Sequence, residues 1–319
     1  MSKSTKILLV AAALCVAGLV FLGVGYASGG RGTSVSLSNG RIAAYDSEKM
    51  VSDTVSLEEF DELYCDFSSY DFSIEQGDEY KLEYTTREDS VPQIKQDGKK
   101  LSLVQKPEHF WVFSFGITDV NENTVVLTVP KDDKIYKIDA SSASGKIKIS
   151  DINLEGNLLI TSGEMSVTGS KAKKDLNIEM TSGETKVADC DFDEVNVKIT
   201  SGDIEFDDCT ASDLKYKSTS GEGTFDNVKS DSFSCDMSSG EIDAENITTD
   251  NLTAKATSGS IKFLLEGASN DYRFNVDKTS GKILIGGGSY DSGSFNEAGE
   301  KQIDVEVTSG SVEIDFTKK

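Results

Sequence analysis

Apolar and polar residues alternate with a period of two over most of the chain beyond residue 55. In residues 193–199, DEVNVKI, the apolar Val195, Val197 and Ile199 alternate with polar Asn196 and Lys198. A period of two places successive side chains on opposite faces of a β-strand, so one face of each run is expected to be buried. No long segment after residue 30 shows helical periodicity, and the pattern therefore predicts an all-β fold.

A phrase built around Thr-Ser-Gly recurs along the second half of the chain. Its glycine stands at Gly145, Gly163, Gly183, Gly202, Gly221, Gly240, Gly259, Gly281 and Gly310, with steps of 18, 20, 19, 19, 19, 19, 22 and 29 residues. A nearly constant step of this length indicates stacked structural repeats. Glycine, serine and threonine are residues that turns favour, so the phrase predicts a corner at which the chain begins a new strand.

Each repeat contains two alternating runs, one on either side of the corner. The residues two and four positions after the glycine are mostly apolar, as in Ile204 and Phe206, and a second run such as Val195–Ile199 precedes the next corner. A single pair of strands cannot bury its apolar face, whereas stacked pairs form one continuous core. The sequence therefore predicts a parallel β-solenoid, or β-helix, with two strands and two turns in each coil of about 19 residues.

The first residues predict a membrane anchor. Lys3 and Lys6 precede an uncharged run over residues 7–27, which as a helix would span roughly 30 Å, the thickness of a hydrocarbon core. The lysines favour a cytoplasmic N-terminus, so we expect the remainder to be extracellular on a single-pass cell membrane protein. A cleaved signal peptide, with Gly25-Tyr26-Ala27 before the cleavage site, is the alternative.

These patterns divide the chain into five parts. We expect a cytoplasmic tail over 1–6, a transmembrane helix or signal anchor over 7–27 and a Gly- and Ser-rich linker over 28–54. An N-terminal β region over 55–134 then forms the beginning or cap of the solenoid, whose repeats occupy 135–319.

Charge and residue usage narrow the possible partners and chemistry. The 319 residues carry 32 Lys+Arg against 55 Asp+Glu, a net charge of −23, which disfavours nucleic acid and anionic membrane surfaces. A single histidine, His109, and five scattered cysteines without a CxxC pair give no zinc site. We expect no catalytic residues, no metal and no cofactor.

Acidic residues follow the corner glycine in five consecutive repeats. They are Glu164, Glu184, Asp203, Glu222 and Glu241. Stacking would place these carboxylates one coil apart, as a stripe along one edge. The stripe is a weak candidate for cation binding, and a solvated row of charges is the favoured interpretation.

An aromatic segment lies between the two halves of the β region. Phe110, Trp111, Phe113 and Phe115 occur within residues 107–120, with Trp111, Phe113 and Phe115 on one face of the expected strand. The favoured interpretation is a strand that caps the open end of the solenoid. The alternative is a protruding hairpin that contacts lipid, sugar or protein.

Two cysteines occupy the same repeat position in adjacent coils. Cys190 and Cys209 each follow their corner glycine by seven residues, and Val228 and Ile247 fill this position in the next two coils. The position is therefore apolar and inward, which favours two stacked thiols in the core. A disulfide between adjacent coils is the alternative.

The chain resembles the bacterial DUF4097-type "putative adhesin" family over roughly residues 55 to 319. The resemblance rests on the membrane segment, on LSLVQKP from Leu101, on residues 123–150, NTVVLTVPKDDKIYKIDASSASGKIKIS, and on the series of TSGE and TSGD corners. It implies a β-solenoid displayed outside the cell, with no catalytic residue set to carry over. The enlarged step from Gly281 to Gly310 departs from the pattern.

The expected function is interaction at the cell surface without catalysis, as adhesion or as an envelope scaffold. The partner would be an unidentified protein or glycan, in addition to the membrane through residues 7–27, and not nucleic acid. An accessory regulator of an envelope stress response is one alternative. A carbohydrate-active β-helix enzyme is another, although residues beyond the linker include only Arg87 and Arg273 as arginines and no GxSxG or HExxH motif.

Overall fold

The computed structural model describes residues 34–38, 41–45, 50–105, 111–114, 123–132 and 134–318, together with Gly18. The chain divides into two compact units, one of Met1–Met50 with Pro107–Asn121 and one of Val51–Lys106 with Glu122–Lys319. The expected anchor over residues 7–27 lies outside the described residues except for Gly18, which is helical. Within the described ranges, none of the helices has the length and apolar character needed to cross a membrane.

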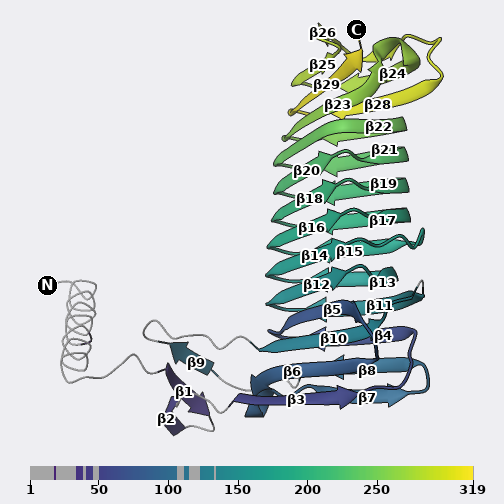
Figure 1. Cartoon of the computed structure of the whole chain (residues 1–319). Helices are drawn as coiled ribbons and strands as arrows, with labels where there is room; N and C mark the ends of the chain where they lie inside the picture. Colours follow the sequence, from purple (N-terminus) through teal and green to yellow (C-terminus); the bar gives the residue numbers. More distant parts are fainter. Residues whose placement is uncertain are drawn as a thin grey trace, which may run out of the picture. The chain divides into compact units, whose positions relative to one another are not determined.

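The larger unit is the predicted β-solenoid, with two parallel sheets (Figure 1). Sheet 1 contains β12 (Lys146–Ser150), β14 (Glu164–Thr168), β16 (Glu184–Ala188), β18 (Asp203–Asp207), β20 (Glu222–Asp226) and β23 (Ser260–Ala268). Sheet 2 contains β11 (Ile135–Ser142), β13 (Asn153–Ile160), β15 (Leu176–Met180), β17 (Asp191–Ile199), β19 (Thr210–Ser218) and β21 (Lys229–Met237). β22 (Glu241–Ala256) contributes to both sheets, since its first residues pair with β20 and its last with β21.

Each coil turns at two corners of different chemistry. At the first, the Thr-Ser-Gly phrase joins sheet 2 to sheet 1, and its backbone bonds to the same corner of the preceding coil, as in Thr200 N–H to the Met180 carbonyl at 2.9 Å. The glycines here have φ of +122° at Gly202 and +132° at Gly221, a region that favours glycine. At the second corner a single left-handed residue returns the chain to sheet 2, as at Asp208 with φ of 50° and Asn227 with φ of 52°.

The space between the sheets is filled by apolar ladders. Val197 from sheet 2 and Ile204 from sheet 1 are buried, and Phe206 stacks on Phe225 of the next coil with ring centroids 5.5 Å apart. Tyr216 occupies the inward position that the smaller Val197 and Cys235 occupy in the neighbouring coils. Gly223 makes room for its ring, because a methyl group on Gly223 would lie 3.1 Å from it. The inward and outward assignment made from alternation is thus confirmed.

At the N-terminal end of the solenoid the parallel stack gives way to antiparallel pairs. The strands here are β3 (Met50–Ser56), β4 (Glu62–Phe67), β5 (Asp71–Gly77), β6 (Lys81–Arg87), β7 (Gln93–Asp97), β8 (Lys100–Val104) and β10 (Thr124–Pro130), with the 3-10 helix η1 (Glu88–Ser90). Sheet 1 continues in the order β12, β5, β10, β6, β3, and sheet 2 in the order β11, β4, β8, β7. The pairs β10–β6 and β7–β8 are antiparallel, so the regular parallel stack stops there.

The C-terminal end departs from the order of the sequence. The last strands in the chain, β28 (Lys301–Val307) and β29 (Ser311–Lys318), insert before β24 (Tyr272–Lys278) and β25 (Lys282–Ile285) in the two sheets. The Gly310 corner therefore stacks on the Gly259 corner, and the Gly281 corner stacks on that of Gly310. The 3-10 helix η2 (Ser269–Asp271) leads into β24. Between β25 and β28 the chain forms two short strands: β26 (Gly288–Ser289) pairs antiparallel with β25, and β27 (Gly293–Phe295) pairs antiparallel with β24.

The smaller unit contains a three-stranded antiparallel sheet in the order β2 (Arg41–Tyr45), β1 (Ser34–Ser38), β9 (Trp111–Ser114). Residues 28–54 therefore contain β1, β2 and the beginning of β3, where the composition predicted a linker. Alternation in two short runs, SVSLS and RIAAY, explains the strands, because each run fits the two-residue period.

Candidate interaction surface

The predicted acidic stripe is present as a single file on the outer face of sheet 1. Register pairs Glu164 with Glu184, Glu184 with Asp203, Asp203 with Glu222 and Glu222 with Glu241, and all five side chains are exposed. Each strand supplies one carboxylate of the row, so the carboxylates follow one another from strand to strand and do not converge on one point. Among the residues that the structure describes, no group of three or more His, Cys, Asp and Glu residues could hold a metal ion.

Lysines compensate the stripe at both ends. Lys146 Nζ lies 3.0 Å from Glu164, and Lys262 Nζ lies 3.0 Å from Glu241. The hydrogen bond to Glu241 raises the pKa of Lys262. In the adjacent outward column, Lys186 and Glu205 pair at 2.6 Å. These contacts belong to solvated ion pairs, which contribute little individually.

The outer face of sheet 2 carries a ladder of asparagines. Asn157 donates to Asp139 at 2.6 Å, Asn177 donates to Asn157 at 3.1 Å, and Asn196 donates to Asn177 at 3.1 Å. Each pair is in register between neighbouring strands, so the amides repeat at the strand spacing of about 4.8 Å. An amide has two donor hydrogens, and Asn157 and Asn177 each use one of them within the ladder, whereas Asn196 also donates to Glu194 at 2.9 Å. The ladder therefore leaves amide hydrogens available at Asn157 and Asn177.

A row of charges of both signs lies beside the asparagine ladder, at the outward positions two residues further along each strand, and Lys198 and Lys217 are like-charged neighbours in it. Its ion pairs join neighbouring coils: Lys198 with Glu179 at 3.0 Å, Lys217 with Asp236 at 3.0 Å, and Lys255 with Glu306 at 2.8 Å. Opposite charges directly across a ladder stabilise the register, whereas the acidic stripe on sheet 1 repeats one sign. The two faces of the solenoid therefore differ in charge pattern.

Two large apolar side chains are exposed within the range whose side chains are described, and both are on sheet 2. Leu159 is 42% exposed and Tyr64 is 40% exposed. Tyr64 pairs with Asp139, which places it in the same column as the asparagines, and Leu159 lies on β13 two residues after Asn157. Asn157, Leu159, Asn177, Glu179, Asn196 and Lys198 line a shallow groove over this face. Sequence reasoning missed the ladder, although the spacing of 20 and 19 residues between its asparagines was a usable signal.

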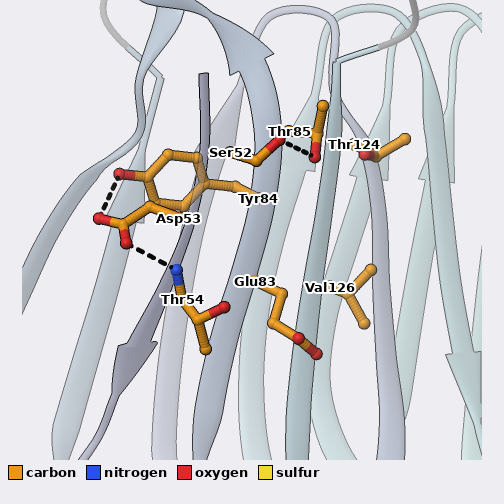
Figure 2. Close-up of a pocket in the computed structure, with 8 residues that line it drawn as sticks. All are labelled: Ser52, Asp53, Thr54, Glu83, Tyr84, Thr85, Thr124 and Val126. Atoms are coloured by element: carbon orange, nitrogen blue, oxygen red, sulfur yellow. Dashed lines mark hydrogen bonds between the residues drawn. The ribbon is translucent and has the colours of Figure 1, made fainter. Parts of the chain in front are cut away.

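A second shallow hollow lies on sheet 1 near its edge strand β3 (Figure 2). Ser52 and Thr85 share a hydrogen bond of 2.8 Å, and Tyr84 donates to Asp53 at 3.4 Å. Partial burial, followed by the charge of Asp53, raises the pKa of Tyr84. Thr124 and Val126 of β10 complete the lining. The polar groups of this hollow bond largely to one another, so fewer of them are available to a partner than in the sheet 2 groove.

The stacked cysteines lie in the core, as the repeat position predicted. Cys65, Cys190, Cys209 and Cys235 are free and buried. Cys190 Sγ donates to the Ala188 carbonyl at 3.1 Å, and Cys209 Sγ donates to the Asp207 carbonyl at 3.2 Å. Burial raises the pKa of Cys235 to about 12, which favours an inert thiol.

The aromatic segment forms β9, which pairs with β1 in the three-stranded sheet of the smaller unit. Trp111 and Phe113 are on this strand, whereas Phe110 and Phe115 lie outside the described residues. At the C-terminal end of the solenoid, Tyr290, which follows β26, and Phe295, the last residue of β27, pack together with ring centroids 4.9 Å apart, and Tyr290 also lies near Phe274. The glycine-rich run over residues 286–294, GGGSYDSGS, together with Phe295 therefore supplies apolar cover that the sequence did not reveal.

Comparison with protein families shows a match to the Toastrack DUF4097 family model over residues 60–315. Among solved structures, a "putative lipid binding protein" from Parabacteroides distasonis ATCC 8503 is similar, with 17% identity, a TM-score of 0.52 and coverage of 84% of this chain and 97% of that chain. A "putative adhesin" from the same organism has 15% identity, a TM-score of 0.48 and coverage of 84% and 98%. The similarity to the first structure shows the fold. A search among curated proteins found no match.

Proposed function

The chain belongs to the Toastrack DUF4097 family, and from this premise we propose that it is a non-enzymatic surface protein whose β-solenoid presents an interaction face for adhesion or envelope scaffolding. Residues 7–27 anchor it in the cell membrane in this proposal, with the solenoid outside the cell. The partner is a protein or glycan that bonds to polar side chains. A similar solved structure is described as a "putative adhesin", and this description applies to that protein.

The observation that carries the proposal is the asparagine ladder on sheet 2. Asn157, Asn177 and Asn196 present amides at a fixed repeat, with the exposed Leu159 beside them. Parallel strands in register hold these groups at constant spacing, so little ordering of the protein is needed on binding. Amides that both donate and accept suit hydroxyl and peptide groups, which glycans and proteins supply.

The arrangement of charges favours binding over catalysis. Ionised side chains on both outer faces pair along columns, such as Lys198 with Glu179 and Lys186 with Glu205. A catalytic site gathers a nucleophile, a base and a stabilising group around one reacting atom. Columns of exposed pairs instead provide an extended polar surface.

Attachment assays test the proposal directly. Cells that display the full chain should attach to glycan- or protein-coated surfaces more than cells without it. Joint substitution of Asn157, Asn177 and Asn196 by alanine should reduce attachment about tenfold at equal surface amounts, because the central polar contacts are lost.

The matched control changes the outer face of sheet 1. Joint substitution of Ser166, Thr168 and Thr224 by alanine removes the same number of outward polar groups and should leave attachment unchanged. Attachment that is equal with and without the protein, or equal in the two triple variants, would contradict the proposal.

A further inference from the structure

The polar residues of the sheet 2 groove repeat from strand to strand. In one outward column, named here the ladder column, register aligns Tyr64, Asp139, Asn157, Asn177 and Asn196. Neighbouring strands lie about 4.8 Å apart, so the steps from β4 to β17 span about 19 Å. A ligand that contacts the whole column must therefore lie along the stack of strands and cross each strand in turn (Figure 1).

The amides of the ladder column have unused hydrogen-bonding capacity. Asn157 donates one hydrogen to Asp139 and Asn177 donates one to Asn157, so each amide keeps a second hydrogen for a ligand. Asn196 donates to both Asn177 and Glu194, and its oxygen, like every amide oxygen, has two lone pairs. Donors and acceptors are therefore available on neighbouring strands, which suits hydroxyl groups because a hydroxyl both donates and accepts.

Exposed apolar side chains flank these amides. Within the range whose side chains are described, Tyr64 and Leu159 are the large apolar residues that are exposed. Tyr64 begins the ladder column, and Leu159 lines the groove beside Asn157. A pyranose ring has faces of C–H groups and edges of hydroxyl groups. Its faces gain by covering apolar side chains while its edges bond to amides, so this surface suits sugar rings.

The groove is close to neutral, in contrast to the chain as a whole. The charged residues that line it are Glu179 and Lys198, and they pair with each other at 3.0 Å. The whole chain carries a net charge of −23. A balanced lining within an acidic protein favours a neutral ligand, because a polyanion would be repelled by the surroundings and a polycation would be drawn to the acidic stripe instead.

The strand spacing separates the possible neutral ligands. An extended polypeptide presents groups on the same side about every 6.6 Å, so it falls out of register with a column of about 4.8 Å within two strand steps. A flat chain of β-1,4-linked pyranoses advances by one ring at close to the strand spacing. Successive rings are flipped, but each ring has hydroxyl groups on both edges and can bond to its own strand. An α-1,4-linked chain of the same sugar coils and turns away from the column.

We propose that the ladder column binds a neutral, extended β-1,4-linked glycan that lies along the stack of strands. One ring packs on Tyr64, and hydroxyl groups of the following rings bond to Asn157 and Asn177. The distance from Tyr64 to Asn196 accommodates about four rings. The inference rests on the proposed interaction function and specifies its ligand.

Oligosaccharides of one sugar and two linkages provide the test. The purified full chain is titrated calorimetrically with cellotetraose, the β-1,4-linked tetramer of glucose, and with maltotetraose, its α-1,4-linked counterpart. Cellotetraose should bind about tenfold more tightly, because only the flat chain reaches both free amide hydrogens. Affinity should also rise from cellobiose to cellotetraose as more strands are contacted. Equal affinity for the two tetramers, or no binding of cellotetraose, would overturn the inference.

Variants locate the binding on the ladder column. Asn157→Ala combined with Asn177→Ala should weaken cellotetraose binding about tenfold through two lost hydrogen bonds. Tyr64→Phe should bind as wild type and Tyr64→Ser more weakly, since the ring makes the contact. The matched control is Ser234→Ala combined with Thr253→Ala, at outward positions of the same column beyond the groove, and it should leave affinity unchanged. Equal weakening in the two double variants would contradict the location.

Attachment of cells that display the chain separates this ligand from the proposed function. Cells should attach to cellulose-coated surfaces, and soluble cellotetraose should compete. Attachment to protein-coated surfaces alone would refute the glycan and leave the interaction function intact, whereas attachment to neither surface would refute both.

Discussion

The carbonyl oxygen of Gly183 lies only 2.4 Å from the point that a methyl group on Gly202 would occupy. Gly202 also has φ of +122°, a conformation that residues with a side chain rarely adopt. Both constraints recur at Gly163, Gly183 and Gly221, where the added group would meet the glycine of the preceding coil. Glycine at this corner is therefore required by the close approach of successive coils as well as by the turn itself.

Replacement of this glycine should destabilise the solenoid. Gly202→Ala is expected to lower the free energy of unfolding by more than about 2 kcal/mol, because strained φ and a backbone clash act together. Ser201→Ala, at the preceding exposed position, should cost less than about 0.5 kcal/mol. Denaturant unfolding of the two variants measures the difference, and similar losses would contradict the role of the close approach.

The sequence predicted the Thr-Ser-Gly corner but not the chemistry of the second corner. Asp189, Asp208, Asn227 and Asn246 all have positive φ six residues after the corner glycine. Asparagine and aspartate adopt this conformation more readily than other residues with a side chain, so their recurrence was a readable signal. It was obscured because acidic residues are frequent throughout this chain.

The two ends of the solenoid could not be predicted from the repeat. Gly310 is the last corner in sequence but stacks between the corners of Gly259 and Gly281. The repeat period in the sequence shows that coils recur, but it does not show which coils are neighbours in space. The strand β28 could pair with β22 because the insertion after Ile285 was long enough to return the chain, and only the three-dimensional packing decides between these orders.

The inward position of Val197 gives a direct test of the core. Its side chain is 1% exposed, so Val197→Asp should lower the free energy of unfolding by about 3 kcal/mol or more, since the carboxylate would be buried without a partner. Lys198→Gln, one residue along, removes only an exposed ion pair with Glu179 and should cost less than about 1 kcal/mol. Thermal denaturation with equal losses for both variants would contradict the assignment of faces.

Gln105 closes the last corner at the N-terminal end of the stack. Its Oε1 accepts from the backbone N–H groups of Ser68 at 2.7 Å and Ser69 at 2.8 Å, whereas the matching N–H groups of later corners bond to carbonyls of the preceding coil. Gln105→Leu should therefore destabilise the protein by about 2–4 kcal/mol through two unsatisfied donors. Gln93→Leu, at an exposed position, provides the comparison. Hydrogen exchange should show faster exchange at Ser68 and Ser69 in the first variant, and unchanged exchange would refute the capping role.

Glu59 should make stability depend on pH in the acid range. Hydrogen bonds from Lys99 and then Lys134 lower the pKa of Glu59 from 4.5 to about 2. A lowered folded-state pKa adds stability that is fully present above pH 4.5 and is lost as pH falls toward 2. Wild type should thus be more stable than Glu59→Gln at pH 7, and the difference should shrink between pH 4.5 and 2.

Salt provides the control for the Glu59 experiment. Because these charges are exposed, high ionic strength should reduce the difference between wild type and Glu59→Gln at neutral pH. Chemical denaturation across the pH series measures it. A difference that stays constant from pH 7 to pH 2 would show that the ion pairs with Lys99 and Lys134 are not its cause.

The acidic stripe allows a test between cation binding and solvation. Its carboxylates lie in register on neighbouring strands at about 4.8 Å, where hydrated like charges repel by about 1 kcal/mol or less. A bound divalent cation would stabilise the folded chain by mass action, whereas solvated charges respond only to screening. The spread of one carboxylate per strand and the lysines at the two ends of the row favour screening. We therefore expect calcium to raise the melting temperature no more than sodium chloride at equal ionic strength. A calcium-specific rise that disappears when Glu184→Gln, Asp203→Asn and Glu222→Gln are combined would contradict this expectation and establish the stripe as a binding site.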